Sequence, residues 1–252
     1  MRPDYFGESV AARYDDDDEM FAPEIVEPAV DFLAGLAGVD EGSAGDNRAP
    51  SALELGIGTG RIAVPLSGRG VLVHGIDLST AMVARLRTKP GAQNIAVTIG
   101  DFATAQAGRM YRLVYLVYNT IGNLTSQDDQ VNCFCNAAAH LEPGGHFVIE
   151  VGVPDLRRLP PGQTAVPFTV EPGRLGFDTY DVATQAMASH HYWTTADGVQ
   201  TLSIPFRYVW PAELDLMARI AGMRLTQRWG DWNREPFTGD SAKHVSVWQK
   251  MP

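Results

Sequence analysis

The chain of 252 residues is 45% hydrophobic and 20% charged, a composition that excludes a disordered or fibrous protein. Its formal net charge of −10 argues against nucleic acid or an anionic membrane surface as partner, because such binding depends mostly on Lys and Arg. The length suits one hydrophobic core, so we expect a single domain.

The sequence favours a cytoplasmic protein. Residues 15–19 form an acidic run where a secretory signal would have an apolar core. No stretch approaches the ~20 consecutive apolar residues that a membrane-spanning helix needs. The two cysteines, Cys133 and Cys135, lie one residue apart in a predicted helix and are poorly placed to pair. We expect both to be reduced, buried thiols.

The first 50 residues predict a lid, a helix and a loop. Residues 1–20 combine aromatic side chains with charges, and we expect a short segment whose rings cover a surface. Apolar residues at helical spacing predict a helix over residues 23–38 that ends at a glycine. Residues 39–50 are rich in Gly, Asp, Asn, Ser and Pro, which is typical of a loop.

From residue 51 onward, short apolar runs alternate with stretches of helical spacing. This alternation predicts an α/β fold with a Rossmann-like, doubly wound and mostly parallel sheet. The ligand of such a sheet binds at the carboxyl ends of the central strands. We predict strands at 52–55, 71–76, 95–99, 113–118 and 147–151, and helices at 60–68, 79–88 and 126–140.

After residue 151 the pattern becomes that of an inserted antiparallel β cap. Five prolines in residues 152–174 indicate a linker rather than a helix or a central strand. The Asp197-Gly198 step marks a hairpin between two later strands. We predict three cap strands, at 175–182, 186–194 and 200–209.

The C-terminal part is expected to complete the main sheet. Pro211 should begin a helix that runs to Gly222. Two strands should follow, at 224–229 and 244–248. The single domain then consists of a lid and helix (1–50), a core (51–151), a cap (152–210) and a C-terminal part (211–252).

A glycine-rich turn follows the first predicted strand. Gly56, Gly58 and Gly60 lack a Cβ, so their backbone can adopt positive φ and approach a ligand closely. Three spaced glycines alone are a weak signal, because turn residues and several nucleotide-binding folds show them too.

Acidic residues near the ends of three predicted strands strengthen that signal. Glu54 lies inside the first strand, where a charge is costly unless it is paired or solvated near a ligand. Asp77 ends the second strand, at the place from which a carboxylate accepts ribose hydroxyls. Asp101 follows the third strand. Together these strand ends predict one cofactor site.

Four segments in order resemble class I S-adenosylmethionine-dependent methyltransferases of the small-molecule type. The resemblance covers about residues 50–151, with a weaker likeness in the N-terminal aromatic segment. It implies S-adenosylmethionine as cofactor and S-adenosylhomocysteine as product. The matching segments are residues 54–61, 75–82, 100–102 and 141–145.

The resemblance implies how the methionine part of the cofactor is held. The three glycines would pass beneath it, and Glu54 would hold nearby groups in place. Tyr118, with Asn119 and Thr120, would border the sulfonium and the acceptor. Tyr14 would be the lid tyrosine near the cofactor carboxylate.

The adenosine part is assigned in the same way. Asp77 would accept both ribose hydroxyls, while Leu78 and Met82 would pack on the adenine. Asp101 would bind the adenine amino group and Phe102 would cover the ring. Taken alone, the three apolar side chains would equally suit an ordinary core.

Two other functions use similar residues. A nicotinamide-dependent oxidoreductase usually has a third glycine at the position of Arg61 and a second mononucleotide-binding half. A noncatalytic sensor would bind S-adenosylmethionine without transferring its methyl group. The methyltransferase remains the closest match.

The acceptor is expected to be a small molecule, methylated on nitrogen or oxygen and less readily on carbon. A base is needed only when the nucleophile must lose a proton. The candidates are His191, which shares a strand face with Ser189 and Trp193, and His190 on the opposite face. Both would also suit packing or surface roles. The other histidines lack metal-ligand spacing, so we predict no metal.

Overall fold

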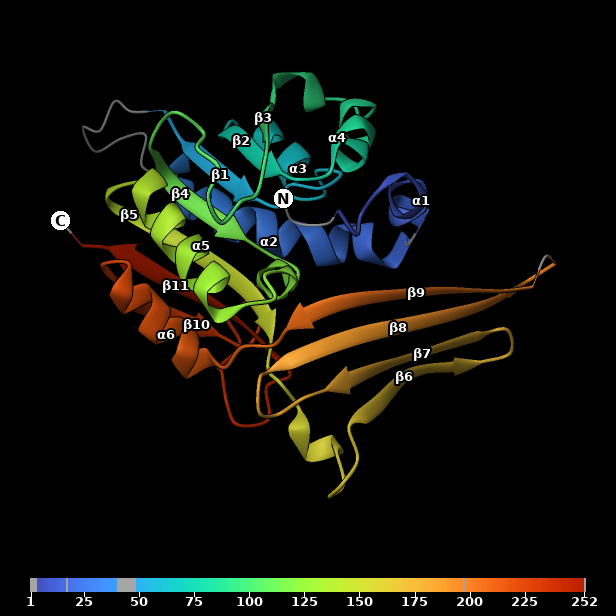
Figure 1. Ribbon diagram of the computed structural model, residues 1–252. Helices are drawn as coiled ribbons and strands as arrows, with labels where there is room; N and C mark the ends of the chain where they lie inside the picture. The colour runs from blue at the N-terminus through green and yellow to red at the C-terminus, as the bar shows by residue number, and fades with distance from the viewer. Residues whose placement is uncertain (1–3, 17, 40–48, 197, 252) are drawn as a thin grey trace.

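The computed structural model contains two separate sheets, one of seven strands and one of four (Figure 1). It describes residues 4–16, 18–39, 49–196 and 198–251. In spatial order the larger sheet consists of β10 (Met223–Trp229), β11 (Lys243–Lys250), β5 (Leu141–Gly152), β4 (Tyr111–Leu116), β1 (Ser51–Leu55), β2 (Leu72–Asp77) and β3 (Ala96–Ile99).

The larger sheet is doubly wound, as the sequence predicts. Strands β1 to β5 are parallel to one another. Strand β11 lies between β5 and β10 and runs antiparallel to both. The strand order reverses between β1 and β4, so the carboxyl ends of these two strands border the crevice where such sheets bind ligands.

Helices cover both faces of this sheet (Figure 1). Prolines begin the second and sixth helices, and Ser79 and Ser126 cap two others with side-chain oxygens, so most boundaries follow local sequence signals. No helix in the described ranges is long and apolar enough to cross a membrane. The helices are α1 (Glu8–Ala11), α2 (Pro23–Ala37), α3 (Ala63–Gly68), α4 (Thr80–Arg87), α5 (Gln127–His140) and α6 (Pro211–Ile220).

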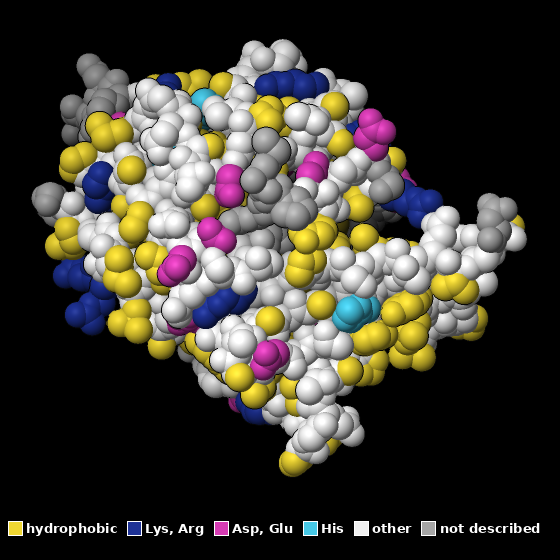
Figure 2. Space-filling view, viewed as in Figure 1, with side chains coloured by type: hydrophobic (Ala, Val, Ile, Leu, Met, Phe, Trp, Pro, Cys, Tyr) yellow, Lys and Arg dark blue, Asp and Glu magenta, His cyan; other side chains and the backbone are white. Residues whose placement is uncertain are grey.

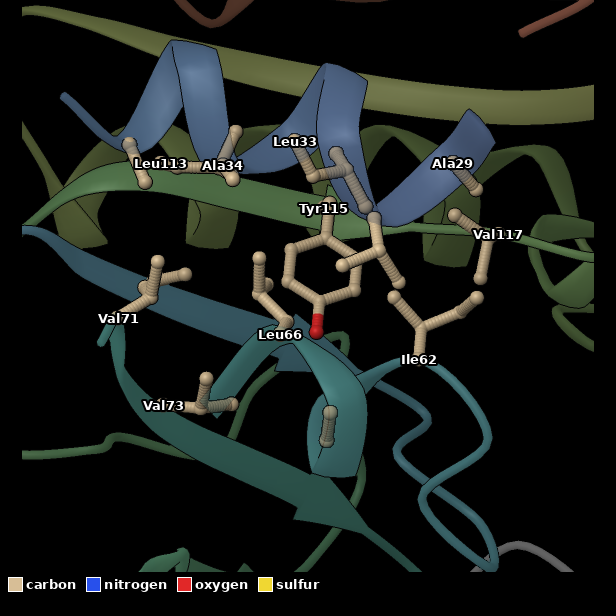
Figure 3. Packing of buried hydrophobic residues seen from close by; sticks show 14 of the residues in the cluster. Ala29, Leu33, Ala34, Ile62, Leu66, Val71, Val73, Leu113, Tyr115 and Val117 are labelled. Atoms are coloured by element: carbon tan, nitrogen blue, oxygen red, sulfur yellow. The ribbon is translucent and has the colours of Figure 1, made fainter. Parts of the chain in front are cut away.

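A buried apolar cluster lies on each face of the sheet. One joins α2 and α3 to the central strands, and the other joins α5 and α6 to the opposite face. Figure 3 shows the ring of Tyr115 between Leu33 of α2 and Leu66 of α3. Tyr115 is fully buried, so its hydroxyl needs a hydrogen-bond partner inside the protein. That partner is Glu54 of β1.

The smaller sheet projects from the core (Figure 1) and confirms the predicted antiparallel cap. Thr195 pairs with Gly198, so β8 and β9 form the predicted hairpin, although Asp197 itself lies outside the described residues. The cap has one strand more than expected, because β6 lies within the supposed linker 152–174. Pro167 is tolerated there since β6 is an edge strand. The cap strands are β6 (Ala165–Glu171), β7 (Arg174–Tyr180), β8 (Ala186–Thr195) and β9 (Gly198–Arg207).

Several predicted boundaries were wrong by a few residues. The fourth strand ends at Leu116 rather than at residue 118, because Tyr118 and Asn119 both have a φ of 59°. The fifth strand begins at Leu141 rather than at residue 147, so the matching segment 141–145 is an irregular stretch within it. Cys133 is buried as predicted, but Cys135 is exposed. Most of the predicted loop 39–50 lies outside the described residues.

Candidate active site

The glycine turn follows directly on β1. Gly56 and Gly60 have φ values of +72° and +79°, which only glycine adopts at little cost. A Cβ on Gly56 would lie 2.7 Å from the side chain of Thr120, and one on Gly60 would lie 2.2 Å from that of Leu86. Gly56 therefore exposes bare backbone to the crevice, whereas Gly60 allows the turn to pack closely against α4.

Asp77 ends β2 and holds the glycine turn in place. Its carboxylate accepts hydrogen bonds from the backbone N–H of Gly58 at 2.7 Å and of Ser79 at 2.8 Å. Burial raises the pKa of Asp77, and these two N–H donors act in the opposite direction. The residue that the sequence assigns to the ribose thus lies against the glycine turn.

A cleft joins most of the predicted cofactor residues. Of the residues assigned from the sequence, it is lined by Tyr14, Gly56, Gly58, Asp77, Leu78, Met82, Asp101 and Phe102.

A second, smaller cavity adjoins the cleft. Both are lined by Tyr14, Gly56, Gly58 and Thr120, so these residues form a shared wall. The second cavity also contains Glu54 and Tyr118, the remaining cofactor candidates apart from Gly60. The structure therefore brings the predicted residues into two adjoining spaces.

Glu54 is only 3% exposed and accepts a hydrogen bond from the hydroxyl of Tyr115 at 2.9 Å. Burial raises the pKa of Glu54 to about 8, although Tyr115 and the nearby Arg61 both lower it. A carboxyl group in this state is close to its titration point at neutral pH. A cationic ligand group in the second cavity would favour its ionised form.

A strained turn presents Tyr118 beside this cavity. Tyr118 and Asn119 are consecutive non-glycine residues in the left-handed region, which is uncommon and marks functional turns. Glu150 accepts a hydrogen bond from the backbone N–H of Tyr118 at 3.2 Å, and Lys243 pairs with the same carboxylate at 2.9 Å. The guanidinium of Arg61 lies 4.0 Å from the centre of the Tyr118 ring.

The N-terminal segment covers the cleft, as its aromatic residues predict. Ser79 donates a hydrogen bond to the backbone oxygen of Phe6 at 2.8 Å, and Thr59 donates one to Asp15 at 2.7 Å. Lys89 adds an ion pair to Asp15 at 3.0 Å. Burial raises the pKa of Tyr14 to about 12, so its hydroxyl is neutral at physiological pH.

Comparison with known proteins assigns this arrangement to a family. A family model described as a methyltransferase domain matches residues 52–145. The CcbJ methyltransferase from Streptomyces caelestis is 33% identical, with a TM-score of 0.79 over 99% of this chain and 100% of its own. This chain is a class I S-adenosylmethionine-dependent methyltransferase.

Two further proteins resemble this methyltransferase. A cypemycin N-terminal methyltransferase from a Streptomyces species is 26% identical over 202 residues, which are 79% of this chain and 82% of the relative. The sugar N-methyltransferase KedS8 from Streptoalloteichus is 19% identical, with a TM-score of 0.68 over 100% of this chain and 96% of its own, and shows the same fold. The family excludes the nicotinamide-dependent alternative.

The residues around the two cavities suit an adenosyl sulfonium in their chemistry. Gly56 and Gly58 add no side chains to the shared wall. The cleft contains Asp77 and Asp101, whose carboxylates can accept hydrogen bonds from ribose hydroxyls and an amino group. The buried carboxyl of Glu54 lines the second cavity.

The two cap histidines lie on opposite faces of β8, as predicted, and neither is among the residues that line these cavities. His191 contacts the hydroxyl of Ser189 at 3.2 Å and stacks on Trp193. His190 lies between the hydroxyls of Thr179 and Ser203, at 3.1 and 2.9 Å. Figure 2 shows apolar side chains and a histidine together over the projecting cap.

Sequence reasoning missed some of the residues around the cleft. Asn123 of the core and Pro205 of the cap strand β9 line the cleft, and Arg61 lines the second cavity. The sequence marks Arg61 as the end of the matching segment 54–61 and as the residue in place of a third glycine, without a role in the site. No motif marks Asn123 or Pro205, because they reach the cleft through tertiary contacts between the core and β9.

Proposed function

We propose that this methyltransferase transfers the methyl group of S-adenosylmethionine to a nitrogen of a small-molecule acceptor, with oxygen as the second choice and carbon as the least favoured. The observation that carries the proposal is that the cofactor residues, the cap and the N-terminal segment line the same cleft. Cofactor residues such as Asp77, the cap residue Pro205 and Tyr5 of the N-terminal segment all line it. Such a space suits an enclosed small acceptor.

Nitrogen is favoured by the similar proteins. The cypemycin enzyme is named for an N-terminal amine, and KedS8 for a sugar nitrogen. A neutral amine also needs the least from the protein, because its lone pair attacks without prior loss of a proton. A hydroxyl of high pKa would need a base, for which we propose His191 or, on the other face of β8, His190.

In the proposed complex the chain mainly binds, orients and excludes water. Asp77 would hold the ribose hydroxyls, while Leu78, Met82, Asp101 and Phe102 would surround the adenine. The methionine part would lie beside Gly56, Gly58 and Glu54, with Tyr14 and Tyr118 around it; Gly60 acts by packing.

S-Adenosylmethionine supplies an electrophilic methyl group on a positively charged sulfur. The C–N bond forms as the C–S bond breaks in line with it, so alignment within the closed cleft is the main contribution of the protein. The proton that the product ammonium carries is then released to water or to a histidine of the cap.

The proposal is tested by calorimetry and by labelled methyl transfer. The wild type should bind S-adenosylhomocysteine, and Asp77→Ala should weaken this binding about 10- to 100-fold, as expected for the loss of hydrogen bonds to a carboxylate. Asp31→Ala, at an exposed carboxylate of α2, is the matched control. A screen of amines, phenols and carboxylic acids with labelled donor should label amines. Labelling confined to phenols or carboxylic acids would contradict the choice of nitrogen.

A further inference from the structure

One residue that lines the cleft has a buried side-chain oxygen without a partner. Among the described residues, four buried side-chain nitrogen or oxygen atoms lack a hydrogen bond, and of these only the carbonyl oxygen of Asn123 belongs to a residue that lines the cleft. A buried acceptor without a donor costs about 1–3 kcal/mol. At the edge of a binding site, such an atom is matched to a donor on the ligand.

Asn123 lies close to the place where the methyl group must be transferred. The sulfur joins the adenosyl and methionine parts of the cofactor, so it belongs at the wall that the two cavities share. Thr120 is part of this wall and begins the 3-10 helix Thr120–Asn123. Side chains three residues apart in such a helix lie above one another, which puts Asn123 directly beyond Thr120.

The cap explains why no protein group satisfies this oxygen. Pro205 of β9 lines the cleft with Asn123 and has no N–H to donate. Gly122 packs against Phe206, so the backbone next to Asn123 is in contact with the cap. The amide of Gln130 donates to the backbone oxygens of Ile121 and Arg207, both at 3.2 Å. These contacts hold the segment before Asn123 against β9.

We infer that Asn123 is a specificity-determining residue whose carbonyl oxygen accepts a hydrogen bond from the N–H of the acceptor amine. This inference rests on the proposed function. An amide oxygen accepts a hydrogen bond without removing the proton, so the lone pair of the nitrogen stays free to face the methyl carbon. As the C–N bond forms and the C–S bond breaks, the N–H becomes part of an ammonium and is still bound to Asn123. Primary and secondary amines carry this donor, whereas tertiary amines and carboxylates do not.

The test compares two ligands that differ at the transfer position. Sinefungin carries an amino group on carbon in place of the methyl-bearing sulfur, and S-adenosylhomocysteine carries none. Calorimetry gives the Kd of each for the wild type, Asn123→Leu and Asn123→Asp. Loss of a hydrogen bond to a charged amine should raise the Kd of sinefungin about 10-fold in Asn123→Leu, with that of S-adenosylhomocysteine within twofold of wild type. In Asn123→Asp the new carboxylate should bind sinefungin more tightly than the wild type.

The outcomes separate this inference from the proposed function. Asn132→Ala, at an exposed asparagine of α5, is the control and should change neither Kd.

Equal weakening of the binding of both ligands in Asn123→Leu would mean that Asn123 supports the fold or binds the adenosine part. No change in either ligand would also overturn the inference. Asn123→Asp, which keeps the shape of the side chain, decides the matter should the leucine variant fold poorly. Failure of the wild type to bind S-adenosylhomocysteine would instead overturn the proposed function.

Discussion

Glu54 is a carboxyl group that folding moves from water into the apolar interior of the sheet. Burial raises its pKa from the usual 4.5 to about 8. The folded chain therefore binds this proton more tightly than the unfolded chain does. The resulting stabilisation is complete below pH 4.5 and is lost as the pH rises through 8. Tyr115, which donates to the carboxyl, does not remove this dependence.

We predict that Glu54→Gln becomes more stable relative to wild type as the pH is raised from 6 to 9. Glutamine retains an oxygen for the Tyr115 hydroxyl and cannot ionise. The midpoints of thermal unfolding of Glu54→Gln and wild type should differ by several degrees more at pH 9 than at pH 6. Each kcal/mol of difference in the free energy of unfolding corresponds to about 2–4 °C for a chain of this size. Glu27→Gln, at an exposed carboxylate, should show no such divergence. A constant difference between Glu54→Gln and wild type would show that Glu54 is already ionised.

A second prediction concerns the proposed base. Burial lowers the pKa of His191, and the nearby Arg174 lowers it further, so the ring is neutral at pH 7 and able to accept a proton. With an acceptor from the labelling screen that must lose a proton, His191→Phe should reduce turnover about 100-fold, the scale of general-base catalysis. The Kd of S-adenosylhomocysteine should stay within twofold.

His190→Phe is the matched comparison, since this histidine lies on the other face of the same strand. A loss of turnover in His190→Phe alone would assign the base to His190. Unchanged turnover in both variants would end the role of the cap histidines in proton transfer.

At the scale of elements, one carboxylate makes two of the contacts that hold the N-terminal segment against the core. Asp15 joins it both to the glycine turn through Thr59 and to the end of α4 through Lys89. We predict that Asp15→Ala releases S-adenosylhomocysteine about 3- to 10-fold faster in stopped-flow experiments, which corresponds to the loss of about one hydrogen bond. The effect should shrink at high salt, because part of the contact is an ion pair.

Asp31→Ala provides the control for this prediction. It removes another carboxylate that pairs with a basic side chain, Arg69, but at an exposed site on α2. Such pairs contribute about 0–1 kcal/mol to stability, and this one lies away from the cleft. Equal release rates for Asp15→Ala and wild type would mean that the lid does not control release.

At the scale of the whole molecule, one polar network holds the cap to the core. Arg207 at the end of β9 is 5% exposed and donates to Gln130 of α5 and to Glu213 of α6. Gln185, just before β8, also donates to Glu213 at 2.8 Å. The base of the cap and the core helices are therefore expected to unfold together.

We predict that Arg207→Met lowers the free energy of unfolding by about 1.5–3 kcal/mol, because Glu213 loses its charged partner and keeps only the hydrogen bonds from Gln127 and Gln185. Urea denaturation followed by circular dichroism measures this loss. Arg157→Met, at an exposed ion pair with Asp155, should cost less than about 1 kcal/mol. If Arg207→Met unfolds at the same urea concentration as the wild type, other contacts hold the cap to the core.

The sequence alone determined the doubly wound fold, the approximate positions of the core strands along the chain and the identity of the cofactor. These features depend on short-range signals. The glycines follow β1 directly, Asp77 and Asp101 follow the next two strands, and serine or proline residues begin most helices. Parallel strands then bring those ends to one edge, since their direction fixes which ends meet.

Only the tertiary structure decided how the cap and the core meet. The sequence missed β6, because prolines argue against a strand unless its edge position is known. It also missed Asn123 and Pro205, which line the cleft through contacts between segments far apart in the chain. Whether a buried oxygen has a partner depends on every segment around it. No periodicity or local motif contains that information.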